Sequence, residues 1–352
     1  MKNRLVHWFG DEGWRRPASW LLGAVLVVIL VVYGVRAVLV DANAPVRLVV
    51  YAFSTQEAAF TQGIFPAFEA AWEAETGRAL TLEGVFGPSG TLAGQINLGA
   101  PADVALFSNA QHVSWLKLGR RVRRDTGLVI FGCTPMVIVT RAGNPAGIGE
   151  IGDLAGVGLR LLHADPRSSG AGEWAVLAEY GSAVLASGNQ AGAAAQLEAI
   201  WGHVRLLAPS ARAALMLFEL GAGDALITYE QDARLARERG IPLEIVVPPS
   251  TIVAQHAAVI VDDNVTPAER PVAEAFVHYL LSDAGQQILG QYHLRPTALQ
   301  ADPFPMLEEP FTVDDLGGWS EAYSEIVEDL WQASIVPRLD LQPAPQLVEP
   351  GE

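Results

Sequence analysis

The chain has 352 residues, of which 50% are hydrophobic and 18% are charged, so it can bury one large core or two medium ones. Its formal net charge of −16 argues against a nucleic-acid partner, because phosphate backbones require a basic surface. Its one cysteine, Cys133, excludes an internal disulfide framework and any cysteine-rich metal site.

The N-terminal part carries a long uncharged apolar run preceded by basic residues. A run of this length is enough to span a bilayer, and the basic flank favours a cytoplasmic N-terminus. We therefore expect residues 1–17 to be cytoplasmic and residues 18–40 to form a single-pass anchor in the cell inner membrane, with the main domain on the periplasmic side. A cleaved signal peptide is the alternative, because Ala42-Asn43-Ala44 has the small-x-small form. Pro45 after the cut and the long segment before the apolar run count against it.

Beyond this segment, short apolar strands alternate with amphipathic helical patterns. The expected strands lie at 47–51, 79–85, 103–107, 157–162, 204–207, 224–228 and 243–247. This alternation predicts parallel sheets with helices on both faces. Two longer apolar runs, at residues 128–139 and 253–261, are expected to carry the chain between two halves. The predicted fold is therefore an α/β protein of two lobes with two strand crossovers and a cleft, preceded by one transmembrane helix.

The expected crossings divide the chain into lobes. Residues 46–137 should form the first part of lobe 1, and residues 138–252 should form lobe 2. Residues 253–335 should return to lobe 1 and supply the C-terminal helices. Residues 336–352 are rich in proline and acid and are expected to form a loose tail.

Four strand-to-helix turns carry a serine at the start of the helix: Ser54, Ser89, Ser169 and Ser210. Ser54 with Glu57 fits a capping box, and the Ser169 hydroxyl can cap its helix. In open α/β sheets, ligands bind at the carboxyl ends of the strands, where such turns lie. Helix N-termini offer free N–H groups and a partial positive charge. The four turns therefore predict a compact, ionised oxyanion in the cleft, although serine also caps many helices that bind nothing.

Other chemistries receive less support. Ser89 lacks the Gly-x-Ser-x-Gly spacing of a nucleophile elbow, and no histidine lies in a turn that obviously faces Ser89 or Ser169. The histidines lack two-ligand spacing on one helix, and no Walker phosphate loop is present. Arg167 is expected to be solvated or salt-bridged. We expect a protein that is not an enzyme, with no catalytic residue, no metal site and no cofactor.

Several segments, in collinear order over residues 46–326, resemble the sulfate-binding proteins of bacterial ABC uptake systems, which have the two-lobed periplasmic binding protein fold. They are Gly87–Gly90, Arg141–Ile148, Pro166–Gly170, Glu219–Glu230, Leu243–Ser250, Val272–Phe276, Tyr292–Pro296 and Phe311–Trp319. The resemblance implies that the anion is held without a counter-ion, by serine hydroxyls, backbone amides and one indole.

Carried over, the resemblance assigns hydroxyl donors to Ser89 and Ser169, backbone donors to Gly170 and Ala171, and a further backbone donor to Ser210. The predicted ligand-binding set is completed by residues of the first two turns and by one aromatic position: Ser54, Thr55, Gly90 and Tyr229.

Three departures from the family pattern concern the pocket. Tyr229 replaces the family's tryptophan donor, Ala171 replaces a second glycine, and the expected aspartate and arginine of the first turn are replaced around Phe53 and Gln56. The resemblance thus implies capture of sulfate or thiosulfate by lobe closure and delivery to an ABC permease. Two alternatives remain open at this point: a molybdate- or tungstate-binding relative, and an anchored scaffold or sensor that kept the fold.

Overall fold

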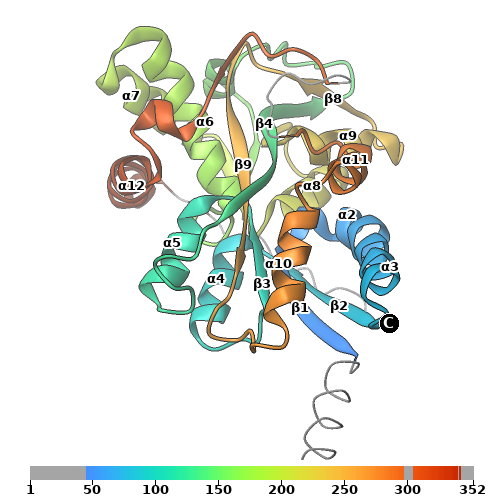
Figure 1. The fold of residues 1–352 in the computed structure, drawn as a ribbon. Coiled ribbons are helices and arrows are strands. Elements are labelled where there is room, and N and C mark those ends of the chain that lie inside the picture. Colours follow the sequence, from blue (N-terminus) through green and yellow to red (C-terminus); the bar gives the residue numbers. More distant parts are fainter. Residues whose placement is uncertain (1–44, 297–303, 340, 342–352) are drawn as a thin grey trace, which may run out of the picture.

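The computed structural model describes residues 45–296, 304–339 and 341, and it has two α/β lobes joined by two long strands (Figure 1). The strand order is β2-β1-β3-β9-β4-β7-β5-β6, with β10 beside β9 and β8 beside β4. The strands are β1 (Val46–Phe53), β2 (Leu80–Gly87), β3 (Val104–Phe107), β4 (Val129–Arg141), β5 (Leu161–Ala164), β6 (Val204–Ala208), β7 (Ala225–Tyr229), β8 (Leu243–Val246), β9 (Ser250–Ile260) and β10 (Glu309–Phe311).

Strands β4 and β9 connect the lobes. Residues 129–135 of β4 pair with β9, whereas residues 136–140 pair with β7 of the second lobe. Strand β9 pairs with β3 of the first lobe through Ala257–Ile260. Both strands are buried over most of their length and mostly apolar, as expected for strands covered on both faces. The two expected strand crossovers are therefore present, whereas the lobe boundaries given above stay a prediction.

Each lobe has three parallel strands covered by helices, and the connecting strands add to them in antiparallel pairs, β9 beside β3 and β4 beside β7. Strand β1 pairs in parallel with β2 and β3, and strand β5 pairs in parallel with β6 and β7. The main helices are α3 (Phe65–Thr76), α4 (Ser89–Asn97), α5 (Ala110–Leu118), α6 (Gly170–Ser187), α7 (Gln190–Trp201), α8 (Ala211–Glu219), α9 (Glu230–Glu238), α10 (Arg270–Tyr279) and α11 (Asp283–Gln291). Parallel pairing places the carboxyl ends of each lobe's strands at one edge, where the following helices begin.

The C-terminal segment packs across the molecule. Helix α12 (Trp319–Glu321) continues into the π-type helix η5 (Ala322–Ile335), which contacts α6 and α7. Trp331 meets Trp201 edge-on at 4.9 Å between ring centroids, and Tyr323 meets Trp115 of α5 at 5.7 Å. This segment therefore touches elements of both lobes.

No helix among the described residues is long and apolar enough to cross a membrane. The predicted anchor at residues 18–40 lies outside the described residues, as does most of the predicted tail at 336–352.

Candidate functional site

A small cavity lies between the lobes at the ends of six strands. Its volume is about 10 Å³, close to the smallest that holds one water molecule. Its lining comprises Phe53, Ser54, Thr55, Gly87, Pro88, Ser89, Ser108, Ser169, Gly170, Ala171, Ser210, Ala211 and Tyr229. The four serine turns predicted from the sequence therefore meet at one place.

Of the predicted ligand-binding residues, only Gly90 does not line the cavity. Its amide donates instead to the Ser168 carbonyl oxygen of the other lobe, at 2.9 Å. Gly90 thus contributes to the contact between the two lobes in this structure.

Helix α6 presents backbone donors to the cavity. Ser169 occupies its N-cap position, and the Ser169 carbonyl accepts from the amides of Gly172 and Glu173 at 2.9 and 3.2 Å. The Gly170 and Ala171 amides lie in the first turn, where no intrahelical acceptor exists, and among the described residues they have no hydrogen-bond acceptor. The prediction that the Ser169 hydroxyl caps the helix is wrong, because this hydroxyl makes no bond to the helix and belongs to the cavity lining.

The first turn also differs from its prediction. Ser54 begins a 3₁₀ turn (Ser54–Gln56) whose N-cap is Phe53, without a side-chain cap. The prediction that Ser54 and Glu57 form a capping box is therefore wrong. The Glu57 carboxylate instead forms an ion pair with Arg212 of the second lobe, at 3.1 Å. By contrast, Ser210 does cap α8, since its Oγ accepts from the Ala213 amide at 3.1 Å.

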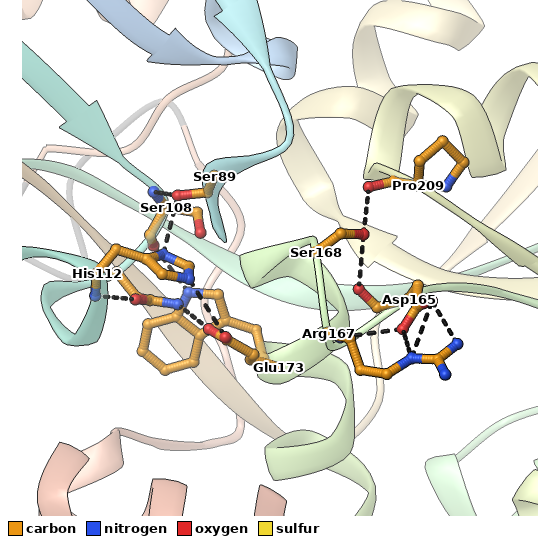
Figure 2. Close-up of polar contacts among 10 residues, drawn as sticks. Ser89, Ser108, His112, Asp165, Arg167, Ser168, Glu173 and Pro209 are labelled. Carbon is orange, nitrogen blue, oxygen red and sulfur yellow. Dashed lines mark hydrogen bonds and ion pairs between the residues drawn. The ribbon is translucent and has the colours of Figure 1, made fainter. Parts of the chain in front are cut away.

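Ser89 is held by a buried polar row (Figure 2). Its Oγ accepts from the Ser108 amide at 3.1 Å and lies 3.0 Å from His112 Nδ1. His112 Nε2 lies 3.3 Å from Glu173 Oε1 of the opposite lobe. The expectation that no histidine faces Ser89 is wrong, because His112 comes from the next turn of the sheet, after β3, and the fold brings it back to Ser89.

Two further hydroxyls belong to the cavity wall. Neither the Ser108 nor the Tyr229 hydroxyl has a hydrogen bond of normal geometry among the described residues. Burial raises the pKa of Tyr229 well above its ordinary value, and contact with Ser108 lowers it in part, so the phenol stays a donor. Sequence reasoning missed Ser108 as a site residue, although it follows β3 just as Ser89 follows β2.

Among the described residues that line the cavity, none has a side chain that is ordinarily charged. Arg167 bonds Asp165 beside the Ser169 turn, with 2.6 Å between Nη2 and Oδ2, so it forms a salt bridge. Phe53 lies beside His256 with 4.6 Å between ring centroids, and burial lowers the pKa of His256 to about 4, so this corner is apolar and neutral. Among the described residues, no group of three or more potential metal ligands is present.

A small cavity between two lobes, lined by O–H and N–H donors, is typical of a two-lobed binding protein for a compact, electron-rich ligand. Residues 48–295 match the family model of the bacterial extracellular solute-binding proteins. A sulfate-binding protein of Salmonella typhimurium is 33% identical over 276 residues, covering 74% of this chain and 83% of the relative. A thiosulfate-binding protein of Pseudomonas aeruginosa is 30% identical, covering 72% and 81%.

The solved structure of the sulfate-binding protein SubI from Mycobacterium tuberculosis is 27% identical, with a TM-score of 0.72, and covers 80% of this chain and 99% of that one. The chain therefore belongs to the bacterial extracellular solute-binding proteins, within the sulfate-binding protein family of ABC transporters. The family resemblance and the two-lobed fold expected from the sequence are confirmed. Membership implies an extracytoplasmic location, and the family is one of binding proteins and not of enzymes.

Proposed function

We propose that this protein captures a tetrahedral oxyanion, sulfate or thiosulfate, in the cavity between its lobes and delivers it to an ABC permease. The observation that carries the proposal is the start of α6, where the Gly170 and Ala171 amides lack acceptors among the described residues and line the cavity. A helix N-terminus of this kind is a ready anion site. Sulfate and thiosulfate are the ligands in the names of the similar proteins, which supports this choice.

The proposed site neutralises the anion with dipoles. Around the two amides stand the hydroxyls of Ser89, Ser108, Ser169 and Tyr229, all from cavity-lining residues. Hydrogen bonds to an ionised acceptor are about twice as strong as neutral ones, and oriented donors need no counter-ion. Such a wall also disfavours phosphate, because a protonated oxygen without an acceptor costs about 1–3 kcal/mol.

We place the ligand in the closed form only. Opening would separate Ser89 and Ser108 on one lobe from Ser169 and Gly170 on the other, because in the described part of the chain the backbone passes between the lobes through β4, β9 and the C-terminal segment. Closure therefore both assembles the site and creates a surface, formed by the two lobes together, that a permease can recognise.

We further propose that residues 18–40 hold the protein at the inner membrane as a single-pass anchor, with the binding domain on the periplasmic side. The support is the uncharged run of the sequence and its basic flank. A tether would keep the loaded protein near its permease.

Thermal unfolding of the full chain in detergent tests the proposal. Sulfate, thiosulfate, molybdate, tungstate and phosphate are each added at about a hundred times a dissociation constant in the micromolar range, where binding stabilises by about 2.7 kcal/mol. We expect sulfate or thiosulfate to raise the midpoint. The Ser169→Ala variant should lose most of this rise, whereas Ser187→Ala, at the exposed end of α6, should keep it.

The other outcomes are equally informative. A rise with molybdate or tungstate alone would keep the site and change the ligand, as the tyrosine at position 229 allows. No rise with any anion would overturn transport and favour an anchored scaffold or sensor.

A further inference from the structure

A buried polar row links the proposed anion site to a carboxylate of the opposite lobe (Figure 2). Ser89 Oγ lies 3.0 Å from His112 Nδ1, and His112 Nε2 lies 3.3 Å from Glu173 Oε1. The other carboxylate oxygen, Glu173 Oε2, accepts from Asn109 Nδ2 at 2.5 Å. The four residues are at most 2% exposed, so in the closed form their polar groups cannot form hydrogen bonds with bulk water.

The hydrogen-bond capacity of Ser89 limits what it can offer a ligand. A hydroxyl has one hydrogen and two lone pairs, and the Ser108 amide already fills one lone pair, at 3.1 Å. When the only ring proton of His112 is on Nε2, facing Glu173, Nδ1 is an acceptor and receives the Ser89 hydrogen. The remaining lone pair of Ser89 then faces the cavity, where it repels an anionic oxygen.

The opposite tautomer reverses this situation. When Nδ1 of His112 carries a hydrogen, it fills the second lone pair of Ser89, and the Ser89 hydrogen is free to point into the cavity. Nε2 and Glu173 Oε1 are buried 3.3 Å apart, and neither has a hydrogen-bond partner among the described residues, so two unprotonated acceptors there would repel and a proton is needed between them. The pair is therefore either imidazolium with carboxylate or imidazole with carboxylic acid, and both hold one proton more than the first arrangement.

We propose that the His112–Glu173 pair takes up one proton from solvent when a fully deprotonated oxyanion binds, and that this proton makes Ser89 a donor to the anion. The inference rests on the proposed function, since it requires an anion next to Ser89. Proton uptake also changes the charge of the pair from −1 to neutral. Glu173 lies in the first turn of α6, and once the pair is neutral its net charge no longer repels an anion bound at the start of this helix.

Other titratable groups near the pair do not compete for this proton. Tyr229 and Tyr323 face Glu173, and burial raises the pKa of both phenols above the ordinary range, so they stay neutral. His256 bonds the Ser108 carbonyl through Nδ1 at 2.9 Å, and burial lowers its pKa to about 4. Among the described residues, the only basic side chain within ion-pair distance of Glu173 is His112. His112 and Glu173 are thus positioning residues that act on the anion through Ser89.

Calorimetric titration of the full chain with sulfate, in two buffers of different protonation enthalpy, measures the proton directly. We expect proton uptake that increases with pH and approaches one proton per sulfate at the alkaline end. There the dissociation constant should rise by up to about tenfold per pH unit, as linkage requires.

A variant separates this proton linkage from a structural role. In Glu173→Gln, the amide oxygen can accept from Asn109 while the amide nitrogen donates to His112 Nε2, which fixes the hydrogen on Nδ1. We expect this variant to bind sulfate at alkaline pH about as tightly as the parent does at acidic pH, with no proton uptake. The matched control is Glu179→Gln, which changes another buried carboxylate 3.3 Å from a histidine, His163, but away from the cavity lining, and should keep the parent pH profile.

The results that overturn the inference differ from those that overturn the function. Sulfate binding without proton uptake, or the same pH profile in Glu173→Gln as in the parent, contradicts proton linkage and leaves oxyanion capture standing. Absence of binding by sulfate and thiosulfate at every pH contradicts the proposed function itself. The parent titration decides between these results even if the Glu173→Gln variant does not fold.

Discussion

The serine hydroxyls of the cavity have different hydrogen-bond partners, although the serines lie in similar sequence contexts. Ser210 uses one lone pair of its Oγ to cap α8, which leaves its hydroxyl hydrogen free for a ligand. Ser169 leaves its hydroxyl outside the helix cap, and Ser89 shares its hydroxyl with His112. Because a hydroxyl has only one hydrogen, the partner that each serine already holds determines whether it can donate to an anion.

Asp232 gives a prediction at the residue scale. Its carboxyl group is buried, Oδ2 has no partner among the described residues, and burial raises its pKa to about 7 against an ordinary 3.8. Between these two pH values the folded state binds more protons than the unfolded state, so this group lowers stability as the pH rises. We expect Asp232→Asn to be more stable than the parent at pH 8 by about 1–3 kcal/mol, and this gain to vanish near pH 4.

Urea unfolding at the two pH values measures this difference. Asp125→Asn is the control, because the Asp125 side chain is 86% exposed and should give no pH-dependent gain. An Asp232→Asn variant that is equally destabilised at both pH values would show that the carboxylate is needed for packing or bonding in the folded protein.

At the element scale, the start of α6 belongs to one lobe but is closely covered by the other. A Cβ atom on Gly170 would lie 1.8 Å from Ser108 Oγ and 2.8 Å from Asn109 Nδ2, both on the first lobe. Gly170→Ala should therefore hold the lobes apart. We expect at least a tenfold loss of sulfate affinity, with stability of the free protein changed by less than about 1 kcal/mol, since alanine suits a helix.

Calorimetry with sulfate and urea unfolding without it separate the two effects. Gly94→Ala is the matched control, because a Cβ there meets nothing within 4 Å and Gly94 also lies in a helix. Undiminished affinity in Gly170→Ala would mean that the lobes bind the anion in a more open arrangement.

The elements of this fold were more predictable than the bonds of its site. The apolar runs that became β4 and β9 are readable because strands buried on both faces need continuous hydrophobic residues. The serine turns could be predicted because the residues at the start of a helix follow a local sequence pattern. The row from Ser89 to Glu173 was not, since it depends on how two lobes meet, and no local pattern connects residues so far apart in the sequence.

At the scale of the whole molecule, several hydrogen bonds join the two lobes. Gln56 Nε2 donates to Gln231 Oε1 at 2.8 Å, and Trp174 Nε1 donates to the Ser108 carbonyl at 2.8 Å. Gln56 and Gln231 are both fully buried. Neither glutamine lines the cavity, so their bond acts on the ligand only through the balance of open and closed forms.

Gln56→Ala tests this balance. Loss of the bond leaves Gln231 buried without its partner in the closed form, which costs about 1–3 kcal/mol, whereas both groups meet water in the open form. We expect sulfate affinity to fall by about 5- to 150-fold, mainly through faster release, because closure holds the ligand. Stopped-flow release of sulfate measures the rate.

The control and the opposing result follow from the same geometry. Gln196→Ala removes a bond within the second lobe, from Gln196 Nε2 to the Glu179 carbonyl, and should leave release unchanged. The double variant Gln56→Ala with Gln231→Ala should recover part of the affinity, since no buried amide is then left unpaired. If Gln56→Ala releases sulfate at the parent rate, closure is held by the anion and its direct contacts, and the bonds between the lobes contribute little.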